Sequence, residues 1–563
     1  MRSLFLFTIG PVKSFIENSR KGIDLYAGSS MLSELMREAV SWLGKREEVM
    51  ILFPFHQMSG EALPNIPNRL VAEFADGSRM EQKAAAEQLT AYVKTCFRQR
   101  CSGLLETAGI SDQGIGQARK QWEDFLEIYW IFEEYHPASH YSEVYQKMLA
   151  GLHEAKSIRT FSQSTEPWGR KCMRFPEYNA VFVKRSRDRR SNTMAYPHHT
   201  NPQYMYDITE NDYLKYTVKE KEALSSIALV KRIYGMQRKD IYSIRNMLLE
   251  SQIPGDLLSG SGLQDLGSEM RTMIANAVYD LENDNALPAD EYRPEAVEMA
   301  GLLYQRMKEN GIRLNSYYAV IKFDGDNMGE AFMLLKTVQE QQELSRRISR
   351  FACEAPGLIV RYGGLPVFAG GEDFLGILPL GSLFGCIGEL RKTFCEIIER
   401  SFSVGISIAH LMQPLREVLY YADAMETQAK ELPGKDAFAI SIIKRSGETI
   451  IMPALSLPAR AEQPHLNDVA GVVEMMKDEE FSRSMFFCIS EQMKCFRQEE
   501  AKPDEALAKI LLKCCIDHSA GDGKQISKEH LLEQLMRFYK HSQSVTEFLH
   551  IVDGIVFLSR EVV

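Results

Sequence analysis

The chain has 563 residues, which is too long for a single hydrophobic core, so several domains are expected. A composition of 45% hydrophobic and 25% charged residues excludes a mainly disordered chain, and a formal net charge of −10 argues against a protein that coats nucleic acid by overall attraction. The apolar run at residues 4–9 is too short for a signal sequence or a membrane span, and ten cysteines without metal-like spacing favour a reducing compartment. We therefore expect a cytoplasmic protein with no membrane partner.

The first part of the chain predicts alternating strands and helices. Residues 4–9 predict a buried strand, which a Gly-Pro turn joins to a long helical pattern. Residues 49–55 and 65–74 predict a second and a third strand, which gives the beginning of a βαβ arrangement. Residues 81–155 are rich in Gln, Glu, Ala and Leu, so helices are expected there.

Residues 156–190 carry ten Lys or Arg residues against three Asp or Glu residues, a local positive excess in an acidic protein. Such a segment can contact a phosphate backbone, and the aromatic residues within it offer faces on which bases could stack. A solvated loop and a contact with an acidic partner protein stay open as alternatives. The aromatic residues are Trp168, Phe175, Tyr178 and Phe182.

The middle of the chain changes character twice. Residues 213–252 predict helix, and residues 251–267 are rich enough in Gly and Ser to predict a loop. From residue 317, YYAVIKFDGDNMGEAF predicts a strand, a turn and a helix. The stretch LIVRYGGLPVFAGGEDFLGILPL then predicts two strands around Gly-Gly-Glu-Asp.

A second run of elements completes this unit. A helix at 383–401, the strand FSVGISIAH, a helix at 415–431 and the strand AFAISII follow in order. The pattern is typical of a ferredoxin-like β-α-β-β-α-β fold. The chain from residue 458 onwards predicts helices.

Three carboxylates are expected to meet at one edge of this predicted sheet. The ferredoxin-like order places the first strand beside the hairpin, so Asp324 should lie next to Glu372 and Asp373. Carboxylates this close repel each other unless cations hold them, and oxygen ligands favour Mg²⁺ or Mn²⁺. Two such ions can activate an attacking hydroxyl and neutralise a leaving pyrophosphate, so we predict Asp324, Glu372 and Asp373 as catalytic metal ligands.

Further residues are expected to hold a nucleotide. The turn after Asp324 opens a helix whose free N–H groups can cradle a triphosphate, and a Gly-Gly pair lets a base or ribose approach the hairpin. Two lysines after the last helix of the unit can return to the same phosphates, although a solvated helix end is the alternative. The predicted nucleotide-binding residues are Gly325, Asp326, Asn327, Met328, Gly329, Gly370, Gly371, Lys430 and Lys435.

Several separated motifs resemble those of the polymerase/cyclase-like large subunit of type III-B, or Cmr-type, CRISPR complexes. FDGDNMGE, FAGGEDFLGILPL and the run AKELPGKDA are similar to the second palm domain of that family. PNR at residues 67–69 and ALSSIALVKR at residues 223–232 are similar to two further segments. The opening of the chain resembles the first palm through Arg20, Lys21, Asp24, Leu25, Tyr26, Ala27, Gly28 and Ser29.

The resemblance implies an α+β protein with two ferredoxin-like palm domains. It implies a complex with CRISPR RNA, target RNA and other Cmr-type subunits, in which ATP is joined into an adenylate second messenger when target RNA binds. The product is a cyclic oligoadenylate or a conjugate of AMP with S-adenosylmethionine. The implied domains are a first palm with insertions at 1–210, a helical domain at 211–315, the second palm at 316–452 and a C-terminal helical domain at 453–563.

Three departures from the family pattern change these expectations. Gly-Gly-Asp-Asp is Gly-Gly-Glu-Asp here, so Glu372 reaches one methylene further. The sequence contains no His-Asp dipeptide, so DNA cleavage of the HD-nuclease type is not expected. The family's zinc-binding CxxC segment keeps only Cys172, so we expect no zinc.

Two other functions stay open. A catalytically inactive scaffold subunit of the same complex is the first alternative, and the Glu at position 372 is the feature that favours it. A free-standing diguanylate-type cyclase is the second, and it leaves the first palm, the basic segment and the C-terminal helices without a use. The enzyme is favoured, because Asp324, Asp373 and Lys430 are all retained.

Overall fold

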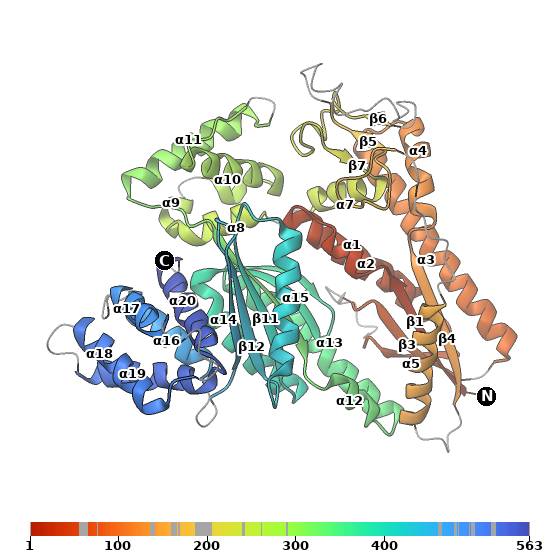
Figure 1. Cartoon of the computed structure of the whole chain (residues 1–563). Coiled ribbons are helices and arrows are strands. Elements are labelled where there is room, and N and C mark those ends of the chain that lie inside the picture. Colours follow the sequence, from red (N-terminus) through yellow and green to blue (C-terminus); the bar gives the residue numbers. More distant parts are fainter. Residues whose placement is uncertain are drawn as a thin grey trace. The chain divides into compact units, whose positions relative to one another are not determined.

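The structure is a computed structural model in which the chain forms two compact units (Figure 1). Unit 1 comprises residues 1–314, 327–353 and 367–371, and unit 2 comprises residues 315–326, 354–366 and 372–563. No helix among the described residues is long and apolar enough to cross a membrane. The residues that the structure describes are 2–55, 66–75, 77–135, 141–158, 166, 169–185, 205–238, 243–259, 262–288, 291–459, 464–477, 481, 483–494, 496, 502–519 and 525–561.

Unit 1 contains a four-stranded antiparallel sheet. The strands are β1 (Arg2–Gly10), β2 (Val49–Phe53), β3 (Arg69–Phe74) and β4 (Glu127–Tyr135), in the order β2-β3-β1-β4. This order and the antiparallel pairing are those of a ferredoxin-like fold, as expected for a first palm.

The prediction of helices throughout residues 81–155 is wrong at β4. The sequence EIYWIFEEY is rich in β-branched and aromatic residues, which favour a strand. The helices α3 (Arg79–Thr107), α4 (Asp112–Glu123) and α5 (Tyr141–Ser157) occupy the rest of that stretch. Helix α3 begins with a capping box in which the Ser78 and Glu81 side chains each bond the other's backbone N–H.

The prediction of helix at 213–252 is confirmed over α7 (Ser226–Gln237) and α8 (Ile244–Gln252), and residues 239–242 lie outside the described residues. Ser225 caps the start of α7, and the preceding strand β7 (Ala223–Leu224) pairs in a small sheet of order β6-β5-β7. The predicted loop at 251–267 contains the short helix α9 and a 3₁₀ turn (Leu263–Asp265). The remaining elements of unit 1 are α1 (Lys13–Glu17), α2 (Gly22–Leu43), β5 (Phe182–Val183), β6 (Tyr206–Asp207), β7 (Ala223–Leu224), α7 (Ser226–Gln237), α8 (Ile244–Gln252), α9 (Gly255–Ser259), α10 (Ser268–Glu282), α11 (Pro294–Glu309) and α12 (Met328–Met333).

The second sheet has six strands in the order β13-β12-β11-β8-β10-β9. Its part β11-β8-β10-β9 has the ferredoxin-like order, as predicted for the second palm. Strand β12 is the predicted closing strand AFAISII, and only β13 extends the sheet beyond it. The strands are β8 (Tyr317–Gly325), β9 (Leu365–Ala369), β10 (Asp373–Pro379), β11 (Phe402–His410), β12 (Ala437–Ile443) and β13 (Thr449–Ser456). Residues 358–361, predicted as strand, form the end of helix α13 (Val338–Arg361).

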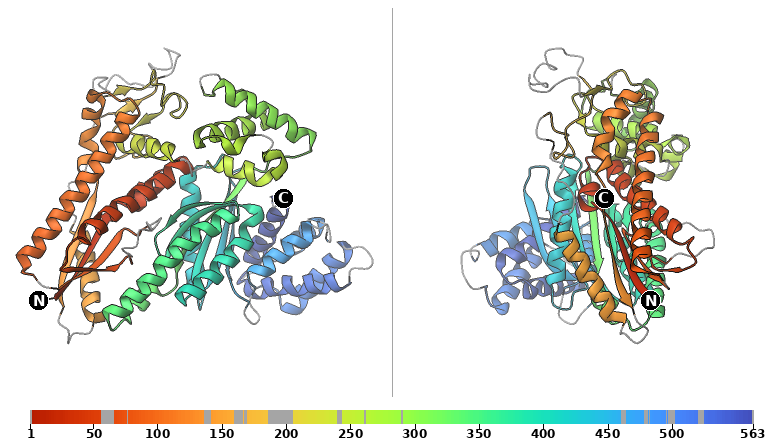
Figure 2. Two further views of the ribbon diagram at one scale, coloured as in Figure 1. Left: turned by 180° about the vertical axis from the view of Figure 1, so that it is seen from behind. Right: turned by 90° about the vertical axis from the view of Figure 1, so that its right-hand side faces the viewer.

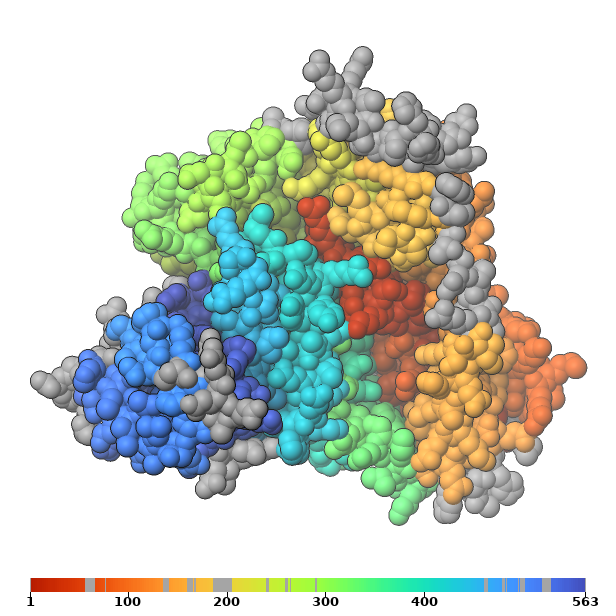
Figure 3. Space-filling view, in the orientation of Figure 1, coloured from red at the N-terminus to blue at the C-terminus, as the bar shows by residue number. Residues whose placement is uncertain are grey.

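Helices α14 (Leu383–Ile398) and α15 (Leu415–Glu431) lie on opposite faces of this sheet (Figures 1 and 2). Helix α15 approaches β11 so closely that a Cβ on Gly405 would lie 2.1 Å from the carbonyl oxygen of Ala422. The outer side of α15 forms part of the cyan surface in Figure 3. This close packing fixes the position of α15 relative to β8 and β11.

The C-terminal part of unit 2 is helical, which confirms the prediction from residue 458 onwards. Helix α20, the last of these, packs on β13 and on α16 and α17. The helices are α16 (Leu466–Lys477), α17 (Arg483–Lys494), α18 (Glu505–Ser519), α19 (Gln525–His541) and α20 (Val545–Glu561).

Candidate active site

Strand β8 presents its residues alternately to the two faces of the second sheet. Phe323 stacks on Phe374 of β10 and Phe402 of β11, with ring centroids 5.0 and 4.1 Å apart, and meets Phe394 of α14 edge-on. Because successive side chains of a strand point to opposite faces, Asp324 lies on the face that α15 covers. The aromatic layer thus anchors three strand ends on one face and leaves the other face for polar groups.

Asp324 and Asp373 form a directly opposed pair on antiparallel β8 and β10. Their carboxyl groups share a hydrogen bond. Burial acts to raise the pKa of Asp324, but the hydrogen bond with Asp373 and the Lys430 ammonium outweigh it and hold that pKa below its usual value. Burial, the Asp324 carboxylate and the nearby Glu372 charge raise the pKa of Asp373 well above its usual value. The pair therefore holds a proton at a pH where isolated carboxyl groups would both be ionised.

Lys430, at the end of α15, is part of this site. Its ammonium group donates hydrogen bonds to Asp324 Oδ2 and, at 2.8 Å, to Glu426 Oε1. Burial acts to lower the pKa of Lys430, but its two carboxylate partners outweigh burial and raise that pKa. Lys322 of β8 pairs with Asp423 and lies 3.5 Å from Glu426 Oε2, so β8 and α15 are joined by alternating charges.

Glu372 stands at the tip of the β9–β10 hairpin, beside the pair. Its carbonyl oxygen accepts the Gly325 N–H at 3.2 Å, which joins the hairpin tip to the end of β8. Among the described residues no three His, Cys, Asp or Glu side chains are gathered into a metal-binding group. The structure thus brings Asp324 and Asp373 face to face, and Glu372 directly precedes Asp373 in the chain.

The donor chemistry of this pair fits a divalent cation. Both groups are carboxylates, and the side chain of Asp324 is 30% exposed. Asp373 has solvent-exposed surface at the strand end, although surrounding protein atoms desolvate its carboxyl group. Once a cation displaces the shared proton, the two carboxylates offer oxygen ligands of the kind that Mg²⁺ and Mn²⁺ prefer. A cation there would compete with Lys430 for Asp324 Oδ2.

Asp326, predicted as a nucleotide-binding residue, is buried. Its carboxylate accepts hydrogen bonds from the hydroxyls of Ser401 and Ser403 and from the N–H of Asp436. Sequence reasoning missed these serines, although a Ser-Phe-Ser run at the start of a strand puts both hydroxyls on the face opposite the Phe402 ring. It also missed Glu426, which helical spacing places one turn before Lys430.

The two hairpin glycines have a local packing reason to be glycine. Gly371 has φ +115°, and a Cβ on it would lie 2.7 Å from Ile348 Cγ2, within unit 1. A Cβ on Gly370 would lie 2.0 Å from the ring of Phe368. Both features demand glycine whether or not a nucleotide approaches the hairpin.

The predicted triphosphate cradle is divided between the two units. Asn327, Met328 and Gly329 belong to unit 1, whereas Gly325 belongs to unit 2. Helix α12 has six residues, Asn327 precedes it in the left-handed conformation at φ +56°, and Met328 is buried. Lys435 lies in unit 2, in a turn after α15, with φ +48°.

The motifs that resemble a first palm meet in a buried charged cluster of unit 1. Arg232 of α7 donates to Asp24 of α2 through Nε at 2.5 Å and Nη2 at 2.7 Å, and its Nη2 lies 3.6 Å from Glu222. Lys231 donates to the Phe15 carbonyl oxygen and to Ser19 Oγ. Burial lowers the pKa of Lys231 to about 7. These contacts join α2, α7 and the chain before α7, so the motif residues hold the fold of unit 1.

The stacking role predicted for the basic segment is wrong for three of its four aromatic residues. Phe175, Tyr178 and Phe182 are buried within unit 1, where Phe125 packs against Phe175 and Tyr178. Trp168 and residues 186–204, with the arginines at 187, 189 and 190, lie outside the described residues. Cys172 is buried, and its sulfur is 3.4 Å from the N–H of Arg174.

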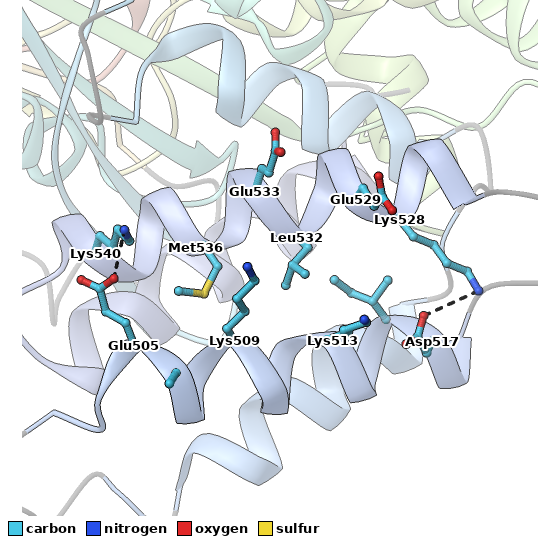
Figure 4. Close-up of a pocket in the computed structure, with 12 residues that line it drawn as sticks. Glu505, Lys509, Lys513, Asp517, Lys528, Glu529, Leu532, Glu533, Met536 and Lys540 are labelled. Atoms are coloured by element: carbon cyan, nitrogen blue, oxygen red, sulfur yellow. Dashed lines mark ion pairs between the residues drawn. The ribbon is translucent and has the colours of Figure 1, made fainter.

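A cavity of about 640 Å³ lies between α18 and α19 in the C-terminal helices (Figure 4). Ion pairs between Lys540 and Glu505, and between Lys528 and Asp517, stand at its ends. Its lining includes Lys509 and none of the predicted site residues. The cavity is thus separate in sequence and in lining from the carboxylate pair.

Comparisons with known proteins match two segments of the chain to family domains. Residues 4–106 match the family described as CRISPR-associated protein Cmr2, N-terminal, and residues 317–439 match Cas10/Cmr2, second palm domain. A curated relative, the CRISPR system Cmr subunit Cmr2 of Pyrococcus furiosus, is 24% identical over a match that covers 80% of this chain. The match covers 62% of that relative, so the chain spans less than two thirds of its length.

Two solved structures share the fold. A cryo-EM structure of type III-B Cmr-beta in the apo state matches with a TM-score of 0.65 and 13% identity, over 99% of this chain and 82% of that chain. A cryo-EM structure of type III-B Cmr-beta bound to cognate target RNA matches with a TM-score of 0.62 and 13% identity, over 99% and 83%. Two separate segments of the chain are thus similar to the Cmr2 N-terminal and Cas10/Cmr2 second palm domains, and the chain shares its fold with type III-B Cmr-beta structures.

Proposed function

We propose that the chain is the nucleotidyltransferase subunit of an RNA-guided type III-B complex. Asp324, Asp373 and Glu372 hold Mg²⁺ or Mn²⁺, and ATP is the substrate. The product is an adenylate second messenger, made when target RNA binds. The observation that carries the proposal is the opposed Asp324–Asp373 pair, whose register and shared hydrogen bond create a two-carboxylate site at a sheet edge.

The residues around the pair suit a triphosphate. Lys430 is a cation already poised at Asp324, and Glu426 holds it there from the preceding turn of α15. A lysine in this place can exchange its carboxylate partner for a phosphate oxygen, and Lys435 adds a second positive charge in the following turn. The protein therefore positions the triphosphate and offsets its charge.

Bound divalent cations would supply Lewis acidity that activates the acceptor hydroxyl and stabilises charge on the leaving pyrophosphate. The carboxylates of this chain would hold those cations, and Lys430 and Lys435 orient the triphosphate so that the α-phosphate is attacked from the side opposite the leaving group. The acceptor oxygen forms a bond to the α-phosphorus, the bond to the pyrophosphate breaks, and the proton of the acceptor passes to water. The acceptor is either a second ATP or S-adenosylmethionine.

Assembly with CRISPR RNA, target RNA and other Cmr-type subunits forms part of the same proposal. It is supported by the two domain matches and by the curated relative, which is named as a Cmr subunit. The basic residues at 156–190 supply charge for an RNA or subunit contact.

Mass spectrometry of the products tests the proposal. The assembled complex is given cognate target RNA and Mn²⁺ with ATP alone, or with ATP and S-adenosylmethionine, and pyrophosphate release is measured in parallel. We expect a new adenylate in at least one mixture, and its loss in Asp373→Ala. If neither mixture yields an adenylate and Asp373→Ala leaves pyrophosphate release unchanged, the chain is a scaffold subunit.

A further inference from the structure

The second aspartate of the Asp-Gly-Asp run has a different environment from the first. Asp326 is 3% exposed, whereas the side chain of Asp324 is 30% exposed. The backbone N–H of Asp326 donates to the carbonyl oxygen of Ser401 at 2.8 Å. Asp326 is therefore tied into the interior of unit 2 at the point where β8 ends.

Three donors converge on the Asp326 carboxylate. The Ser401 hydroxyl donates to Oδ2 at 2.7 Å, the Ser403 hydroxyl donates to Oδ1 at 2.8 Å, and the Asp436 N–H donates to Oδ2 at 2.9 Å. Each oxygen of the carboxylate thus accepts at least one hydrogen bond from a group of the protein. A carboxylate so engaged and so buried has little capacity left for a metal or a nucleotide.

Asp436 continues the connection to α14 and to β13. Its carboxylate accepts two parallel bonds from the Arg391 guanidinium, Nε to Oδ1 and Nη2 to Oδ2, each at 2.7 Å. Its carbonyl oxygen accepts the Leu457 N–H at 2.9 Å. The residue after Lys435 is therefore held by its N–H, its carbonyl oxygen and its side chain.

The turn that these bonds hold has an unfavourable backbone. Gly434, Lys435 and Asp436 have φ values of +83°, +48° and +51°. Left-handed conformations are strained for residues with a side chain, so surrounding contacts must impose the shape of this turn. Among the contacts of this turn, Asp326 and Arg391 bond the backbone and the side chain of Asp436, and the Lys435 N–H donates to the Leu432 carbonyl oxygen at 2.8 Å.

We propose that Asp326 is a positioning residue that fixes the turn carrying Lys435, and with it the end of α15 that carries Lys430, at the end of β8. This inference rests on the proposed function, because it assigns both lysines to the triphosphate. Asp326 acts through Asp436 and touches neither cation nor substrate. In the Asp-Gly-Asp run, the carboxylate of Asp324 thus faces the site, whereas the carboxylate of Asp326 fixes the turn beside it.

Substitution by Asn separates positioning from metal binding. In Asp326→Asn the retained oxygen still accepts the Asp436 N–H, and the Ser403 hydroxyl can rotate to accept a bond from the new amide. A positioning role therefore predicts that Asp326→Asn keeps Mn²⁺ affinity within about twofold, whereas Asp326→Ala raises the KM for ATP about tenfold or more with a smaller change in kcat. A metal ligand would instead lose Mn²⁺ affinity on losing its charge.

Arg391→Met provides an independent test far from the substrate. It removes both bonds to the Asp436 carboxylate and leaves Asp326 intact, so it should raise the KM for ATP in the same direction as Asp326→Ala. The KM for ATP of the double variant Asp326→Ala/Arg391→Met should be no higher than that of the more affected single variant, because both changes loosen one turn. Lys392→Met, on the exposed side of the same helix, is the matched control and should leave the KM unchanged.

Amide hydrogen exchange measures the proposed connection without any ligand. In Asp326→Ala and in Arg391→Met, residues 432–437 should exchange at least tenfold faster than in the unchanged protein. Unchanged exchange there in both variants, or a loss of Mn²⁺ affinity in Asp326→Asn as large as in Asp324→Asn, would overturn the inference. Should the unchanged protein fail to bind ATP at all, the exchange experiment still decides the role of Asp326, and the failure belongs to the proposed function.

Discussion

Asp324 and Asp373 face each other across antiparallel β8 and β10, and their carboxyl groups share a hydrogen bond. The neighbouring pair in this register, one residue further towards the sheet centre, is Phe323 and Phe374, whose rings stack. The aromatic pair thus lies in the same strand register as the acidic pair and on the opposite face of the sheet. Chemistry at this sheet edge depends on packing on the opposite face.

Lys430→Met tests the lysine beside the pair. The variant should weaken ATP binding in the presence of Mg²⁺ by about tenfold to a hundredfold, since charge-assisted hydrogen bonds contribute about 1.5–3 kcal/mol. Isothermal calorimetry measures this affinity. Lys322→Met is the matched control, because Lys322 pairs with Asp423 and Glu426 on the same surface. Equal losses in both variants would mean that Lys430 contributes only general positive charge.

Gly371→Ala tests the packing account of the hairpin glycines. We expect a loss of about 1–3 kcal/mol in the free energy of unfolding, because the new Cβ is strained at φ +115° and crowds Ile348. Gly329→Ala is the control within the same unit, since nothing lies within 4 Å of its added Cβ. Urea unfolding compares the two variants. A neutral Gly371→Ala would show that the hairpin can shift, and the packing reason would then be wrong.

Lys231→Met tests the buried cluster of unit 1 through pH. Burial lowers the pKa of Lys231 to about 7 in the folded protein, whereas an unfolded lysine has its usual value of 10.5. Between these two values the unfolded chain binds a proton that the folded chain does not, so stability rises with pH, by at most about 1.4 kcal/mol per pH unit. Lys231→Met should reduce this slope between pH 7 and 9.

The measurement is urea unfolding at pH 7, 8 and 9, with the slope compared rather than the stability at one pH. Lys83→Met, which removes an exposed lysine of α3, should leave the slope unchanged. An identical slope in Lys231→Met and in the unchanged protein would show that Lys231 keeps an ordinary pKa in the fold.

The second palm could be predicted well from sequence because its elements carry strong local signals. The predicted strands FSVGISIAH and AFAISII and the helix at 415–431 have the observed bounds. The topology then brought Asp324 to Asp373, as expected. Residues 358–361 were predicted as strand because a short apolar run does not distinguish a strand from a buried helix end.

The role of Asp326 could not be predicted from its motif. Two aspartates separated by one residue look alike in sequence, and only the contacts with Ser401 and Asp436 show that the second is buried. The same limit applies to Phe175 and Phe182, because aromatic residues within a basic segment suit a stacking surface and a buried core equally well.

Binding of Mn²⁺ together with ATP by the unchanged protein, Asp324→Asn, Asp373→Asn and the double variant tests the carboxylate pair most directly. Electron paramagnetic resonance counts bound Mn²⁺, and calorimetry gives the affinity for ATP. We predict that each single variant loses at least about tenfold in metal-dependent ATP affinity, which corresponds to about 1.4 kcal/mol. The double variant should have nearly the same ATP affinity as either single variant, because the two carboxylates act as one site. Metal-dependent ATP affinity in Asp373→Asn equal to that of the unchanged protein would contradict the assignment of this pair.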